Sequence, residues 1–75
     1  MAEISYKIEK EIGVLSEAPS GWTRQINLVS WNGREAKLEI RDWAPNRERA
    51  GRGMTFTKDE IKKLIKFLVK AELDK

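Results

Sequence analysis

Cysteine and histidine are both absent from this chain of 75 residues. Their absence excludes disulfides, the common zinc sites and catalysis centred on Cys or His. The longest unbroken apolar run, residues 67–69, is far too short to cross a membrane. The first residues, Met1-Ala2-Glu3, do not have the features of a signal peptide. The sequence therefore predicts a cytoplasmic protein that binds no membrane, metal, cofactor or small-molecule substrate.

Proteins of this size have little room for a hydrophobic core. A chain this short buries only about 60% of the surface that its unfolded form exposes, so a single copy would be marginally stable. Small domains usually gain stability from disulfides, a metal ion or a partner subunit. The lack of cysteine and histidine excludes the first and argues against the second, so the sequence predicts one domain over residues 1–75 that forms oligomers. Leu, Ile, Val and Phe account for 18 residues, which argues against a disordered chain.

Positive charge is present only in modest excess. Fifteen Lys and Arg residues against twelve Asp and Glu give a net charge of +3, and the isoelectric point is about 9.4. Residues 1–19 carry a net charge of −2, so the basic excess lies in the rest of the chain. This distribution permits binding to nucleic acid but does not by itself predict it.

Apolar residues that alternate along the chain predict four strands followed by one helix. The predicted strands cover residues 4–14, 22–31, 36–43 and 54–56. Between the last two, residues 44–53 show no periodicity and are expected to form an exposed loop. Thr57 and Glu60 are spaced as a capping box, which predicts that a helix begins there.

The register of the central hairpin follows from its apolar residues. Pairing Leu28 with Leu38 requires a loop of odd length, which we place at residues 32–34. The same register pairs Ile26 with Ile40, so all four residues share one face, the expected core. A slip by one residue would expose that whole face, and the hydrophobic pattern therefore outranks the two-residue turn favoured by the Asn-Gly dipeptide.

This register places polar and aromatic side chains together on the opposite face of the sheet. They are Thr23, Gln25, Asn27, Val29 and Trp31 from one strand, and Lys37, Glu39, Arg41 and Trp43 from the other. Indole rings give stacking platforms for unpaired bases, and arginine and lysine neutralise phosphates. The face is therefore a candidate surface for single-stranded nucleic acid.

Other interpretations of this face stay open. Tryptophan is more often a core or interface residue, so Trp31 could close the end of a sandwich and Trp43 could lie under the loop at residues 44–53. The aromatic face could also bind a protein, which would make the chain a small dimeric adaptor. An enzyme is not supported, because the carboxylates are spaced among lysines as surface charge. The fragment Gly51-Arg52-Gly53 leads into a strand and not into a phosphate-binding helix.

The predicted C-terminal helix carries apolar residues on more than one face. One stripe consists of Ile61, Leu64, Ile65 and Leu68. Phe67 and Val69 lie partly off that stripe and have no evident place within the chain. A second apolar face indicates a partner in addition to the helix's own sheet.

Two segments resemble a known family of DNA-binding proteins. Residues 38–43, followed by a polar loop and residues 51–57, resemble the "DIREY…GRKGISL" signature of the transcriptional coactivator family known as positive cofactor four. The likeness is greatest to its short bacterial branch, the YdbC-like proteins. That branch shares Gly21-Trp22, the segment 29–32, and Ile40-Arg41 with a following Trp-x-Pro.

The resemblance implies an α+β protein whose subunit has the order β-β-β-β-α and a curved antiparallel sheet. It also implies a homodimer formed through the helices and sheets. It implies a groove that binds single-stranded DNA with little sequence preference, in transcription, its regulation, replication or repair. RNA as a competing ligand is left open. The long regulatory tail of the eukaryotic members has no counterpart here.

Individual positions carry over from the family motif. Trp31 matches the aromatic residue that ends the second strand and stacks on bases. Arg41 matches the arginine of the Ile-Arg pair, and Arg52 matches a basic residue that binds phosphate. Eukaryotic members place a second stacking aromatic residue at the position of Ala44, and Trp43 would replace it here. The candidate nucleic-acid-binding residues are Trp31, Trp43, Arg24, Lys37, Arg41 and Arg52, with Arg24 on the inward face.

Overall fold

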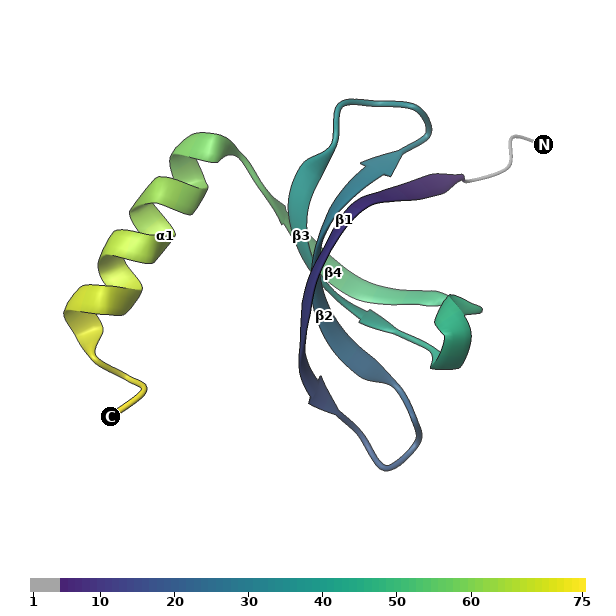
Figure 1. Ribbon diagram of the computed structural model, residues 1–75, viewed down its shortest axis with the longest axis horizontal. Coiled ribbons are helices and arrows are strands. Elements are labelled where there is room, and N and C mark those ends of the chain that lie inside the picture. Colours follow the sequence, from purple (N-terminus) through teal and green to yellow (C-terminus); the bar gives the residue numbers. More distant parts are fainter. Residues whose placement is uncertain (1–4) are drawn as a thin grey trace.

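The computed structural model describes residues 5–75 as one antiparallel sheet and one helix (Figure 1). The strands are β1 (Tyr6–Glu17), β2 (Thr23–Trp31), β3 (Lys37–Trp43) and β4 (Ala50–Phe56), with a short 3₁₀ turn η1 (Pro45–Arg47) and helix α1 (Lys58–Ala71). The strands follow one another in the sheet in chain order, β1-β2-β3-β4. The predicted class and element order are confirmed. Ile4, the predicted start of the first strand, lies outside the described residues.

The central hairpin has the register that its apolar residues predicted. Leu28 pairs with Leu38, and the neighbouring isoleucines pair in the same register. The connection covers residues 32–36, longer than the predicted loop but still of odd length. Asn32 and Gly33 have φ values of 52° and 74°, the left-handed region that asparagine and glycine tolerate best. The hydrophobic pattern therefore set the pairing, and the Asn-Gly dipeptide supplied the turn.

Strand β1 is longer and less regular than the sequence indicated. Its pairing with β2 shifts three times, and each shift leaves one extra residue on β1. Such bulges bend a strand and increase its twist, and at the edge of a sheet they discourage pairing with another chain. The bulges also explain why the apolar alternation fails near Lys10.

Strand β4 begins at Ala50, four residues before the predicted position. Gly51 and Gly53 hide the strand in the sequence, because they replace the side chains that would have alternated. A Cβ atom at Gly53 would lie 2.6 Å from Arg41 Cζ, and one at Gly51 would lie 2.8 Å from the Trp22 ring. Glycine is needed here because large neighbouring side chains approach the backbone closely.

Helix α1 begins where the capping box predicted. The Thr57 side chain accepts a hydrogen bond from the Glu60 backbone N–H at 3.2 Å, and the Glu60 carboxylate accepts one from the Thr57 N–H at 2.9 Å. The helix projects to one side of the sheet, and the extensive packing within the chain is between neighbouring strands (Figure 1). No helix within residues 5–75 has both the length and the apolar character needed to cross a membrane.

The two faces of the sheet differ in burial. We call the face that carries Asn27, Val29, Trp31, Glu39, Arg41 and Trp43 the polar face, and the face that carries Ile26, Leu28, Leu38 and Ile40 the apolar face. The most deeply buried strand residues lie on the polar face, whereas the apolar face is only half-buried. The prediction that the apolar face forms the core of a single chain is wrong. It fails because α1 does not fold back across that face.

Candidate nucleic-acid interface

Trp31 ends β2 on the polar face, where its side chain is half-buried. Its indole Nε1 donates a hydrogen bond to Glu39 Oε2 at 2.6 Å. The Arg41 guanidinium carbon lies 4.9 Å from the centre of the indole ring, and the Tyr6 ring centre lies 5.3 Å away. Trp31 is therefore held in one orientation by its neighbours while part of the indole stays accessible to solvent.

Trp43 lies on the predicted face but is not accessible. Its side chain is 0% exposed, and its ring is parallel to that of Trp31 with centres 6.2 Å apart. Tyr6 packs against it with a ring-centre distance of 5.0 Å. The prediction that Trp43 faces solvent is wrong, because strand pairing decides the face of a side chain but not what covers it. No base can stack on Trp43 in this arrangement.

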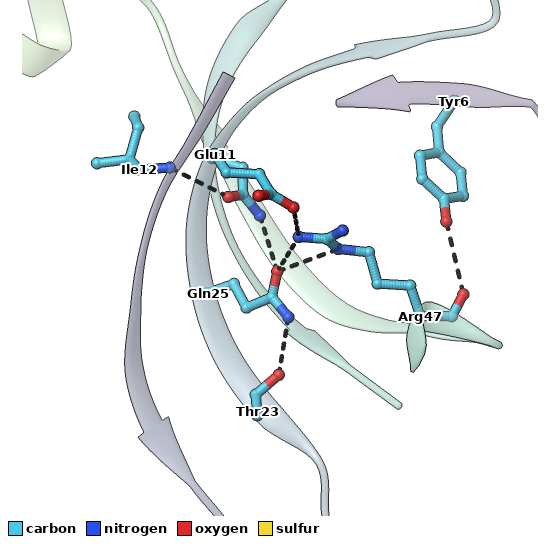
Figure 2. A network of polar contacts seen from close by, with 7 residues as sticks. Tyr6, Glu11, Ile12, Thr23, Gln25 and Arg47 are labelled. Carbon is cyan, nitrogen blue, oxygen red and sulfur yellow. Dashed lines mark hydrogen bonds and ion pairs between the residues drawn. The ribbon is translucent and has the colours of Figure 1, made fainter. Parts of the chain in front are cut away.

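A polar network links the β3–β4 connection to the sheet (Figure 2). The Arg47 guanidinium in η1 donates to Gln25 Oε1 from Nε at 3.2 Å and from Nη2 at 3.0 Å. Its Nη2 also donates to Glu11 Oε1 at 2.7 Å, and the Tyr6 hydroxyl donates to the Arg47 carbonyl oxygen at 3.5 Å. Arg47 was not among the predicted site residues. The loop expected to be free in solvent is therefore tied to β1 and β2.

The amide side chains of the polar face belong to the same network. Asn27 Nδ2 donates to Gln25 Oε1 at 3.0 Å, and Gln25 Nε2 donates to Thr23 Oγ1 at 2.8 Å. The Ile12 backbone N–H donates to Asn27 Oδ1 at 3.4 Å. These amides stabilise the buried polar face from within and are not turned toward a ligand.

Arg41 forms an internal ion pair with Glu39. Its Nε lies 2.7 Å from Glu39 Oε1 and its Nη2 lies 3.1 Å from Oε2, while Nη1 donates to the Gly51 carbonyl oxygen at 2.7 Å. The side chains of Arg41 and Glu39 are 18% and 1% exposed. Burying a carboxylate is costly unless it is paired and hydrogen-bonded, so the charge of Arg41 is first needed to compensate Glu39. Sequence reasoning missed this role, although two charges of opposite sign two residues apart on one strand were the available signal.

The other predicted cations occupy different places. Lys37 pairs with Val29 on the polar face and is exposed. Arg52 is also exposed, in a bulge of β4 where two residues lie opposite Asp42. Arg24 lies on the apolar face, where its Nε is 2.8 Å from Asp42 Oδ1. This hydrogen bond lowers the pKa of Asp42 and raises the pKa of Arg24.

The structure thus brings together part of the predicted site. Four of the six candidate residues share the polar face: Trp31, Trp43, Lys37 and Arg41. Arg24 does not join them, because its strand position points it to the other face, as its inward position in the sequence pattern indicated. Tyr6, Glu39 and Arg47 complete the surface, and the roles of Tyr6 and Arg47 depend on contacts between distant parts of the chain.

Comparison with known proteins identifies the family of this chain. Residues 18–67 match the family described as transcriptional coactivator p15 (PC4), a family of nucleic-acid-binding proteins and not of enzymes. The chain is also 36% identical over 72 residues to an uncharacterized protein of Treponema pallidum (strain Nichols), a match that covers 96% of this chain and 85% of that protein. The family match spans β2, β3 and β4 and therefore the whole polar face of the central hairpin. The chain belongs to the transcriptional coactivator p15 (PC4) family.

Proposed function

We propose that this protein is a homodimer that binds single-stranded DNA with little sequence preference, in transcription, replication or repair. The observation that carries the proposal is the half-exposed indole of Trp31, fixed beside the Arg41 guanidinium in a chain of a nucleic-acid-binding family. Stacking on an indole requires unpaired bases and accepts any base, which accounts for the preference for single strands and for the lack of sequence selection.

The aromatic surface for the bases consists of Trp31 and Tyr6. Tyr6 is 39% exposed and lies next to Trp31, so the two rings offer adjoining aromatic surfaces. Trp43 packs against both rings but is fully buried, so it does not itself contact bases. A base stacked on this surface would gain about 1–3 kcal/mol of binding free energy.

Phosphate binding falls mainly to cations without an internal partner. Lys37 and Arg52 are exposed, and neither forms an ion pair within the part of the chain that the structure describes. Arg41 contributes less, because its charge is balanced by Glu39. Neutralising phosphates releases counterions, so the affinity is expected to fall as salt rises.

The homodimer is supported by two apolar surfaces that one chain leaves open. The apolar face of the sheet is half-buried, and in α1 the side chains of Phe67 and Val69 are 62% and 73% exposed. Large exposed apolar surfaces on a soluble protein often mark an interface. A second copy would cover the helix and the sheet together, and would supply the stability that a chain of this size lacks.

A titration with three nucleic acids tests the proposed function. A fluorescent oligothymidylate of about 20 nucleotides, its duplex with oligoadenylate and the matching RNA are titrated with protein at two salt concentrations. We expect the single strand to bind more tightly than the duplex, with an affinity that falls with salt. Equal affinity for the single strand and the duplex would contradict the stacking proposal. No binding to any nucleic acid would favour a protein-binding adaptor instead.

A further inference from the structure

Glu39 is the most deeply buried charged residue among those the structure describes, at 1% exposed. Its Oε1 accepts a hydrogen bond from Arg41 Nε at 2.7 Å. Its Oε2 accepts two, from Arg41 Nη2 at 3.1 Å and from the Trp31 indole N–H at 2.6 Å. One carboxylate therefore holds both the indole and the guanidinium.

A buried ion pair is weak evidence for stability. Apolar residues of similar volume often replace such a pair without loss, whereas removal of one partner leaves the other charge buried and unpaired. The three hydrogen bonds of Glu39 instead fix the orientation of the two side chains that donate them. The bond from the indole N–H fixes the rotation of the Trp31 ring, and the two bonds from the guanidinium fix the plane of Arg41.

Strand β4 is shaped to keep Arg41 in this position. Gly53 lies opposite Arg41 in the sheet, and a side chain there would overlap the guanidinium, with a Cβ 2.6 Å from Arg41 Cζ. The neighbouring Gly51 supplies the carbonyl oxygen that accepts from Arg41 Nη1 at 2.7 Å. Arg41 is therefore packed against the backbone of β4 and hydrogen-bonded to the carboxylate of Glu39 on its own strand, β3.

We propose that Glu39 is a positioning residue of the DNA-binding surface, which orients Trp31 and Arg41 as one unit without contacting the DNA itself. The inference rests on the proposed function, because it concerns how the same surface binds a single strand. A ring already held in its binding orientation loses little side-chain freedom when a base stacks on it, and this increases affinity.

A double-mutant cycle tests the proposal. Glu39→Leu removes all three hydrogen bonds, and Glu39→Gln keeps an oxygen that can accept from the indole N–H. Each variant is combined with Trp31→Ala, and binding to oligothymidylate is measured at one salt concentration. Glu35→Gln is the control, because it removes the same charge from an exposed side chain of the β2–β3 connection.

We expect Glu39→Leu to weaken binding about three- to tenfold, a part of the stacking free energy of one base. Glu39→Gln should recover part of this loss, and Glu35→Gln should not weaken binding. In the Trp31→Ala background the Glu39→Leu effect should fall below about twofold, because Glu39 then positions only Arg41, which contributes less to binding than Trp31 does. An equal loss in both backgrounds would overturn the positioning role and leave the proposed function intact. Failure of the unmodified protein to bind would instead overturn the proposed function.

A measurement on the unmodified protein covers the case in which Glu39→Leu does not fold. Hydrogen exchange of the indole N–H is followed by NMR for Trp31 and for Trp22, whose N–H makes no hydrogen bond within residues 5–75. The Trp31 proton should exchange more slowly. Exchange at the same rate would show that Glu39 does not hold the indole, and the positioning role would be overturned.

Discussion

The polar and apolar faces of the sheet are built from the same strands, yet the polar face is the more deeply buried of the two. Hydrogen bonds of Arg47 and Glu39 and the packing of the Tyr6 ring cover the polar face. The apolar face stays half-buried, because α1 points away from it. The difference is that contacts within the chain bury the polar face, whereas they leave the apolar face half-buried, as the proposed homodimer requires.

The largest effect is expected from a charge placed among the exposed apolar side chains of α1, which should prevent a second copy from binding. Phe67→Asp should abolish dimer formation and greatly lower the stability, since association and folding are linked in a small obligate dimer. Light scattering should give about twice the chain mass of 8.7 kDa for the unmodified protein and a much smaller mass for the variant.

Lys66→Asp is the matched control, because it places the same carboxylate on the adjacent, exposed position of α1. It should leave the mass unchanged. The proposed homodimer would be contradicted if the unmodified protein stayed monomeric at micromolar concentration and Phe67→Asp were equally stable.

On the polar face, Trp43→Ala should be nearly as damaging. The ring is fully buried and packs against both Tyr6 and Trp31, so its truncation should lower the free energy of unfolding by about 3–5 kcal/mol. Thermal or denaturant unfolding measures this directly. An unchanged melting temperature would mean that Trp43 faces solvent, as its strand position alone suggested.

Gly53→Ala tests how closely the polar face is packed. The added methyl group would overlap the Arg41 guanidinium, so we expect a loss of about 1–3 kcal/mol of stability together with weaker binding to single-stranded DNA. Gly13→Ala is the control, since a Cβ there would meet only Ile26, at 4.0 Å. Equal stability of the two variants would argue against close packing of the Arg41 side chain on the backbone of β4.

The smallest expected effect concerns the ion pair of the apolar face. Arg24 lowers the pKa of Asp42 from its usual value of 3.8, so the pair adds stability above that value. This stability is lost as the pH falls through the lowered pKa. The unmodified protein should therefore melt slightly above Asp42→Asn at neutral pH, and the two should converge near pH 2. A difference that persists in acid would have to arise from something other than this pair.

Local patterns in the sequence were sufficient to predict the element order and the register of the central hairpin. A side-chain period of two fixes which residues share a face, and a capping box fixes where α1 begins. The pairing of Leu28 with Leu38 and the start of the helix after Thr57 followed from these rules. The sequence gives no such pattern for β4, where glycines replace alternating side chains.

Burial could not be predicted in the same way, because it depends on contacts between distant parts of the chain. Trp43 was placed on the correct face, but Tyr6 and Arg47 approach that face from β1 and from η1. The role of Glu39 likewise depends on the indole that the register brings beside it. Whether the apolar face is a core or an interface depends on a second chain, which the pattern of one chain does not specify.

The central claim is that bases stack on Trp31. Titration of Trp31→Ala with oligothymidylate over a range of salt concentrations tests it most directly. We expect a loss of about 1–3 kcal/mol of binding free energy, with an unchanged dependence on salt because stacking releases no counterions. Unchanged affinity in the folded Trp31→Ala variant would contradict the claim.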